Sequence, residues 1–70
     1  MSNSVYKVIE LVGTSDTSWE EAAKSAVDLA SKSLRELRVA EVTQLDMTVG
    51  KNGEITYRAK LKVSFKFESA

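Results

Sequence analysis

The side chains of this sequence that could do chemistry are few, and their types restrict that chemistry. The chain has no histidine and no cysteine. Their absence removes the most common general base, the common catalytic triads and every imidazole or thiolate metal site. No spacing in the sequence supports a Ser–Lys or paired-carboxylate site, and the three glycines form no phosphate-binding loop. We therefore expect a protein that is not an enzyme.

Two residues of opposite charge are the clearest candidates for a binding site. Asp46 and Arg58 fall almost opposite each other if the chain turns back near residues 51 and 52. A cross-strand salt bridge is the simplest interpretation. Alternatively, Asp46 is a ligand of a hard cation such as calcium or magnesium, which oxygen atoms bind, and Arg58 contacts an anion.

Trp19 and three lysines are the other candidates. Trp19 lies on the apolar side of a predicted helix, where it is interpreted as a core anchor; the alternative is a stacking surface for a planar ligand. The lysines form a basic stripe along the last predicted strand: Lys60, Lys62 and Lys66. This stripe is interpreted as a solvated face that limits edge pairing. The alternative is a contact with glutamates of another copy, namely Glu20, Glu21 or Glu41.

Hydrophobic patterning predicts the elements that position these residues. Residues 5–12 are rich in β-branched residues and predict a strand, and residues 13–17 predict a turn. Ser18 and Glu21 form a capping box, after which apolar residues at three- and four-residue steps predict a helix to about Leu37.

The second half of the chain predicts a hairpin. Residues 41–49 form a strand with Val42, Gln44, Asp46 and Thr48 on one face, and residues 50–53 form the turn. Residues 54–67 alternate strictly between apolar and polar and predict a long strand with one face on a core. The sequence therefore predicts an α+β fold of β-α-β-β order, a three-stranded antiparallel sheet wrapped around one long helix.

Length and composition predict an oligomer. Seventy residues form a single domain, residues 1–70, whose core is marginal alone. Without disulfides or a thiolate metal site, association with identical copies is the remaining source of stability. Ten basic residues balance ten acidic ones, so we expect neither nucleic acid nor a membrane as a partner. The sequence shows no signal-peptide pattern, and the expected location is cytoplasmic.

Most of the chain resembles the dodecin family. The resemblance is carried by residues 5–15 (VYKVIELVGTS), the long helix, residues 40–42 (AEV) and residues 61–66 (LKVSFK). It implies a β-α-β-β subunit that assembles into a hollow homododecamer. It also implies a non-catalytic binding or storage protein, because many dodecins hold stacked flavins at subunit contacts.

The positions that bind flavin in dodecins differ in this chain. The resemblance places Val39 where a stacking Trp is found, Arg58 where a Gln contacts the flavin ring, and Asp46 where an Arg contacts phosphate. Lys66 alone keeps the basic character of its position. Trp19 lies at the helix start and does not replace the stacking residue, so weak or no binding of riboflavin, FMN or FAD is implied.

The altered positions resemble those of the calcium dodecin subgroup. That resemblance implies calcium as the bound ion, with Asp46 as the main candidate ligand and Glu20 as a second one. A site built from one carboxylate of each subunit would leave no local sequence motif. The expected function is calcium or small-ligand binding by a homododecameric shell. The alternatives are flavin storage and a structural cage without a specific ligand.

Overall fold

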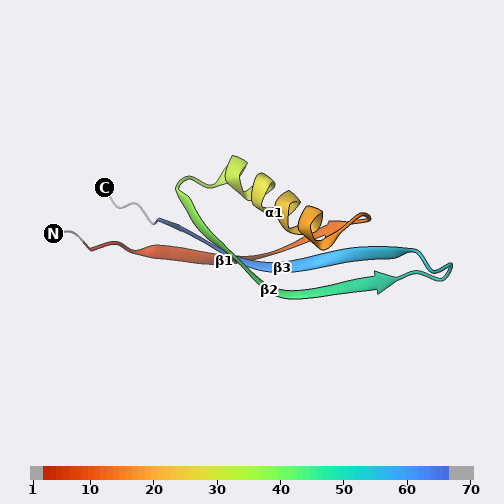
Figure 1. Cartoon of the computed structure of the whole chain (residues 1–70). Coiled ribbons are helices and arrows are strands. Elements are labelled where there is room, and N and C mark those ends of the chain that lie inside the picture. Colours follow the sequence, from red (N-terminus) through yellow and green to blue (C-terminus); the bar gives the residue numbers. More distant parts are fainter. Residues whose placement is uncertain (1–2, 67–70) are drawn as a thin grey trace.

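The computed structural model describes residues 3–66 as three strands and one helix (Figure 1). In chain order they are β1 (Tyr6–Ser15), α1 (Trp19–Ser33), β2 (Leu37–Val49) and β3 (Ile55–Lys66). The predicted α+β class and the β-α-β-β order are therefore confirmed. Position 67, the last of the predicted final strand, lies outside the described residues.

The long strand β3 is the centre of the sheet. The strand order is β1-β3-β2, and both neighbours run antiparallel to β3. Odd-numbered residues of β3 face α1, and Ala59, Leu61 and Val63 are buried there. Even-numbered residues of β3 lie on the opposite side of the sheet, which we call the helix-free face. The alternation predicted for this strand is thus confirmed.

The helix is shorter than the sequence predicts, because α1 ends at Ser33 and not near Leu37. Leu34 has an extended backbone, with φ of −114° and ψ of 139°, and its amide donates to the Ala30 carbonyl. Glu36 takes a left-handed φ of 57°, which turns the chain into β2. Leu37 then lies opposite Phe65 in the sheet. Its apolar side chain fits the helical spacing and the strand equally well, so spacing alone could not place it.

Strand β1 runs further than the sequence predicts and ends at Ser15, within the turn expected over residues 13–17. Gly13 lies opposite Ala59 and is buried under the helix. A Cβ atom at this position would collide with the carbonyl oxygen of Ala22. Gly13 is therefore needed for the close approach of α1 to β1, and it continues the strand rather than ending it.

The helix leaves much apolar surface uncovered. It packs mainly on β1 and β3, and β2 forms the edge of the sheet on the other side of β3 (Figure 1). The buried part of the core is small: Ala22, Ala26, Ala59, Leu61 and Val63. Within residues 3–66, eleven large apolar side chains are exposed: Val5, Tyr6, Val8, Val12, Leu29, Val39, Val42, Leu45, Met47, Val49 and Ile55. So many exposed apolar residues indicate contact with another molecule.

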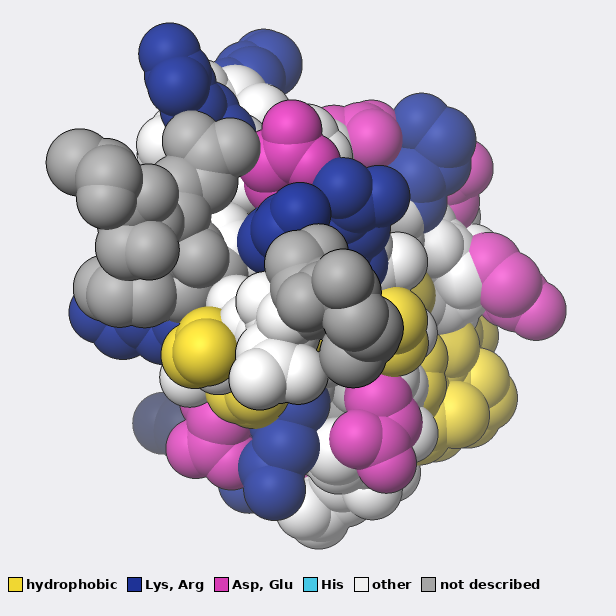
Figure 2. All heavy atoms as spheres, turned by 90° about the vertical axis from the view of Figure 1, so that its left-hand side faces the viewer, with side chains coloured by type: hydrophobic (Ala, Val, Ile, Leu, Met, Phe, Trp, Pro, Cys, Tyr) yellow, Lys and Arg dark blue, Asp and Glu magenta, His cyan; other side chains and the backbone are white. Residues whose placement is uncertain are grey.

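The charged surface is mixed in sign. Seen from the end opposite the β2–β3 turn, positive and negative side chains alternate across the surface, and hydrophobic side chains emerge beside them (Figure 2). Among the described residues, no helix is both long enough and apolar enough to cross a membrane.

Candidate functional site

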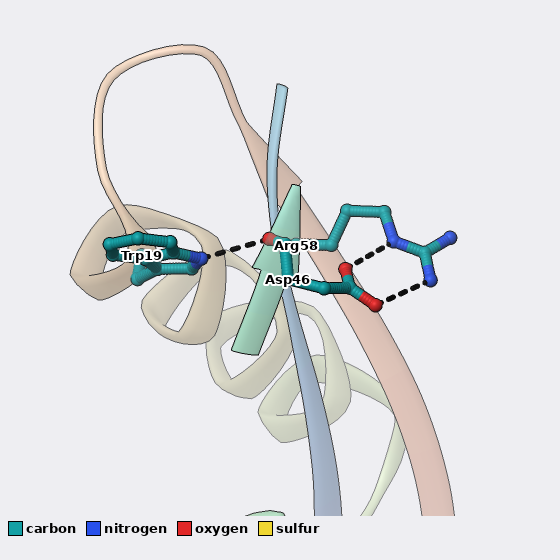
Figure 3. Close-up of polar contacts among 3 residues, drawn as sticks. All are labelled: Trp19, Asp46 and Arg58. Atoms are coloured by element: carbon teal, nitrogen blue, oxygen red, sulfur yellow. Dashed lines mark hydrogen bonds and ion pairs between the residues drawn. The ribbon is translucent and has the colours of Figure 1, made fainter. Parts of the chain in front are cut away.

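Asp46 and Arg58 form a two-pronged ion pair across β2 and β3. They lie opposite each other in the sheet. Arg58 Nε donates to Asp46 Oδ1 at 2.7 Å, and Arg58 Nη2 donates to Asp46 Oδ2 at 3.0 Å (Figure 3). The two side chains keep 35% and 33% of their surface exposed, for Arg58 and Asp46 respectively. The cross-strand pairing predicted from the sequence is confirmed.

The pair fixes the charge of both groups. The hydrogen bonds from Arg58, followed by its positive charge and that of Lys60, hold the pKa of Asp46 below its ordinary value of 3.8. The hydrogen bond and charge of Asp46 raise the pKa of Arg58 in return. Asp46 is therefore a carboxylate at neutral pH, as a cation ligand must be, but both of its oxygens already accept hydrogen bonds.

The backbone of Asp46 is bound from the other side of the sheet. Trp19 Nε1 donates to the Asp46 carbonyl oxygen at 2.9 Å, and Figure 3 shows the indole on the helix side with the carboxylate directed away from it. The Trp19 ring also contacts the Tyr57 ring edge-on, at a centroid distance of 5.0 Å and an angle of 73°. Trp19 is half-buried. It joins α1 to β2, and this use agrees with the interpretation of Trp19 as an anchor.

Trp19 is positioned by local sequence. Ser18 caps the helix by accepting a hydrogen bond from the Glu21 amide at 3.0 Å, which confirms that half of the predicted capping box. The Ser15 hydroxyl accepts from the Thr17 amide at 3.0 Å and orders the loop before the cap. These contacts hold the first turn of α1 in a position from which the Trp19 indole reaches β2.

Glu20 and Asp46, the two candidate metal ligands, lie on opposite sides of the sheet within one chain. Glu20 borders a pocket of about 310 Å³ on the helix side, lined also by Trp19, Ala23, Val42 and Leu45. The Asp46 carboxylate lies on the helix-free face. In residues 3–66, no group of three or more Asp or Glu side chains could hold a metal ion. The donor type suits a hard cation, but one chain supplies too few oxygens for the six to eight that calcium takes.

The four positions identified by resemblance share the helix-free face. Arg58 and Lys66 are even-numbered residues of β3, and Asp46 and Val39 lie opposite Arg58 and Ser64. They do not form one pocket within a chain, because Arg58 and Lys66 are eight residues apart along β3, which is about 26 Å. Val39 is exposed and Lys66 is half-buried.

An irregularity in β2 places these side chains on one face. The register shifts by one residue between Val42 and Gln44, and the hydroxyl of Thr43 donates to the Lys60 carbonyl at 3.2 Å. Val42 therefore faces the helix side with Leu45, and its predicted place on the polar side of the strand is wrong. Val39, before the shift, shares the helix-free face with Asp46, after it.

Tyr57 and Thr43 are contributors that sequence reasoning missed. The alternation of residues 54–67 predicts Tyr57 only as an apolar position of the last strand, and nothing in this pattern indicates its contact with Trp19. For Thr43, a signal existed: Val42 is the one apolar residue among the polar positions assigned to its face. A break in alternation of this kind is typical of a bulge.

Comparisons with known proteins agree with this architecture. The Dodecin family model matches residues 5–68. Over 67 residues, the chain is 57% identical to the calcium dodecin of Mycobacterium tuberculosis, covering 96% of this chain and 94% of that protein. Over 64 residues, it is 42% identical to the dodecin of Thermus thermophilus, covering 91% and 93%.

Solved structures show the same fold. The crystal structure of the M. tuberculosis calcium dodecin, described as a calcium-chelating antigen with a novel calcium-binding site, aligns with a TM-score of 0.86 at 55% identity over 94% of each chain. The dodecin of Streptomyces coelicolor aligns over 100% of both chains with a TM-score of 0.91 and 37% identity. With a family model that matches residues 5–68 and a relative 57% identical over nearly the whole chain, this chain belongs to the dodecin family.

Proposed function

We propose that this chain is a single domain over residues 1–70 that assembles into a homododecameric shell and binds calcium without catalysis. The proposal depends on one observation: the helix-free face carries Asp46, an ionised and partly exposed carboxylate, among the positions that resemble dodecin ligand sites. The 57% identity to a calcium dodecin supports calcium as the ion.

Assembly is required for the site as well as for stability. Calcium takes six to eight oxygen ligands, and the described part of one chain offers no cluster of three acidic side chains. Asp46 carboxylates from several copies, completed by water, would supply the missing oxygens. The large apolar side chains that are exposed in the described part of the chain provide the surface through which copies would associate.

Flavin binding is expected to be weak or absent. Val39 offers no aromatic ring for stacking, and Arg58 already donates to Asp46 at two atoms. The same protein is proposed to act in the cytoplasm, without nucleic acid or a membrane as partner. The equal numbers of positive and negative residues support the expected absence of nucleic-acid and membrane partners.

Calorimetric titration of the assembled protein with calcium tests the cation site. We expect heat of binding for the wild type and a large loss of affinity for Asp46→Asn, which keeps the side-chain shape but removes the charge. Asp28→Asn is the matched control, because Asp28 is an exposed acidic residue of the helix. Equal binding by wild type and Asp46→Asn would remove Asp46 from the site.

Two further measurements separate the alternatives. Light scattering should give the mass of twelve copies, and a monomer at micromolar concentration would contradict the shell. Riboflavin fluorescence should remain unquenched on addition of protein. Strong quenching would favour flavin storage, whereas a dodecamer that binds neither calcium nor flavin would be a structural cage.

A further inference from the structure

We propose that Arg58 sets the cation affinity of Asp46 by competing with the cation for the same two carboxylate oxygens. This inference rests on the proposed function, since it concerns the same carboxylate. It goes further by assigning a role to a residue that no oxygen-ligand scheme would include. Arginine carries five donors and no acceptor, so Arg58 cannot bind a cation itself.

The competition follows from the geometry of the pair. Nε and Nη2 of Arg58 donate to Oδ1 and Oδ2 of Asp46, at 2.7 and 3.0 Å. A calcium ion would approach these oxygens to about 2.3–2.6 Å. The guanidinium and the ion carry charges of the same sign, so they repel each other when held by one carboxylate. Full coordination by Asp46 therefore requires that Arg58 release at least one oxygen.

The pair is placed where such a release can occur. Both side chains are about one third exposed, so water can replace either partner without leaving a buried charge. Arg58 also lies opposite Thr14 on β1, on the same helix-free face. The long arginine side chain could turn towards that strand or into solvent while Asp46 stays in place, because Trp19 holds the Asp46 backbone from the other side.

Because Arg58 must first release Asp46, the apparent affinity for calcium is lower than that of the open carboxylate. A cation that binds only the open form has its dissociation constant multiplied by the inverse of the open fraction. If the pair is open for about one tenth of the time, apparent affinity falls about tenfold. Replacing Arg58 should restore the calcium affinity that is lost to the closed ion pair. We expect a gain of about three- to tenfold, in the range of a partly exposed two-pronged pair.

The test variant must not bring a new ligand. Glutamine at position 58 would offer an amide oxygen that calcium can use, so Arg58→Met is the better replacement because it keeps a long chain without oxygen. Lys60→Met is the matched control. Lys60 lies two residues away on the same face and lowers the pKa of Asp46 through its charge rather than through a hydrogen bond.

Calorimetric titration with calcium tests the proposal. It compares the assembled wild type with Arg58→Met and Lys60→Met. We expect Arg58→Met to bind about three to ten times more tightly, and Lys60→Met to change by less than about twofold. An unchanged or weaker affinity for Arg58→Met would overturn competition. An equal gain from Lys60→Met would also overturn it, because the effect would then be general electrostatics.

A second variant keeps the test decisive if Arg58→Met does not assemble. Arg58→Lys retains the charge but cannot make the two-pronged contact, so its affinity should lie above that of the wild type. An affinity at or below the wild-type value would contradict the proposal.

Asp46→Asn separates this proposal from the proposed function. If the wild type and Asp46→Asn bind calcium equally, the ion is held elsewhere and both proposals fail. If binding depends on Asp46 but not on Arg58, only the competition is overturned. The double variant Asp46→Asn/Arg58→Met should bind no better than Asp46→Asn, since without the carboxylate there is nothing to compete for. A gain in this background would also count against competition.

Discussion

Trp19 and Asp46, 27 positions apart in the sequence, are joined by a hydrogen bond of 2.9 Å from the indole Nε1 to the backbone carbonyl oxygen. The bond fastens the first turn of α1 to the strand that carries the candidate ligand. It leaves the Asp46 side chain free to engage Arg58 on the opposite face. The position of the carboxylate therefore depends on a residue that never touches it.

Replacing Trp19 by Phe should weaken the fold. Phenylalanine keeps the edge contact with Tyr57 but lacks the donor, so the half-buried Asp46 carbonyl loses its partner. We expect a loss of about 1–2 kcal/mol in the free energy of unfolding, measured by urea denaturation followed by circular dichroism. Trp19→Ala, which also removes the ring, should cost more. A Trp19→Phe protein as stable as the wild type would show that the hydrogen bond adds nothing.

The Asp46–Arg58 pair should give stability a specific dependence on pH. Because the pKa of Asp46 is lowered in the folded protein, the unfolded chain takes up the proton first as the pH falls. The contribution of the pair is therefore complete well above pH 3.8 and disappears as the pH falls through the lower folded pKa.

Unfolding measurements from pH 7 to pH 2 would show this effect. The difference in unfolding free energy between wild type and Asp46→Asn should be constant near neutrality and shrink in acid. The difference in unfolding free energy between wild type and Arg58→Met should shrink in acid in the same way. A difference that grows in acid would have the wrong sign for a lowered pKa.

Gly13→Ala should destabilise the protein, because its Cβ would collide with the Ala22 carbonyl oxygen, a backbone atom that cannot move alone. A loss of about 1–3 kcal/mol is expected from such overpacking. Gly50→Ala is the control, since its Cβ would meet the flexible Glu54 side chain. In thermal unfolding, the Tm of Gly13→Ala should fall much further below that of the wild type than the Tm of Gly50→Ala does. Equal changes in the two variants would refute a special role for the close approach of α1 to β1.

Leu45→Asp should impair assembly. Leu45 is 51% exposed on the helix side of β2 and borders the pocket next to Trp19. A charge there should reduce the mass seen by light scattering at micromolar concentration, because burying it without a partner is costly. Asn52→Asp, in the exposed β2–β3 turn, adds the same charge as a control. If both variants keep the wild-type mass, this surface is not a contact between copies.

The sequence predicted the elements that have a single clear period or cap. The alternation of β3, the Ser18 cap and the Asp46–Arg58 pairing followed from local patterns and hairpin geometry. The end of the helix did not, because Leu34 and Leu37 satisfy both helical and strand spacing. Leu34 ends the helix with an extended backbone, and Leu37 is placed by the pairing of β2 with β3, where it lies opposite Phe65.

The candidate site was predictable in composition but not in arrangement. The absence of histidine and cysteine limited any metal to oxygen ligands, and resemblance identified Val39, Asp46, Arg58 and Lys66. Their common face depends on the register shift at Thr43, and the separation of Glu20 from Asp46 depends on which side of the sheet the helix covers. The register shift is indicated only by the apolar Val42 among polar positions, and the side that the helix covers is a three-dimensional property that residue types do not encode locally.

The bare apolar surface of β2 has a thermodynamic consequence. Whatever covers Val42, Leu45 and Met47 must recognise the folded chain, since the unfolded chain does not present these side chains together. By mass action, the melting temperature should then rise with the concentration of that companion. The lifetime of the chain against proteolysis would then depend on the abundance of that companion as much as on the chain's own sequence.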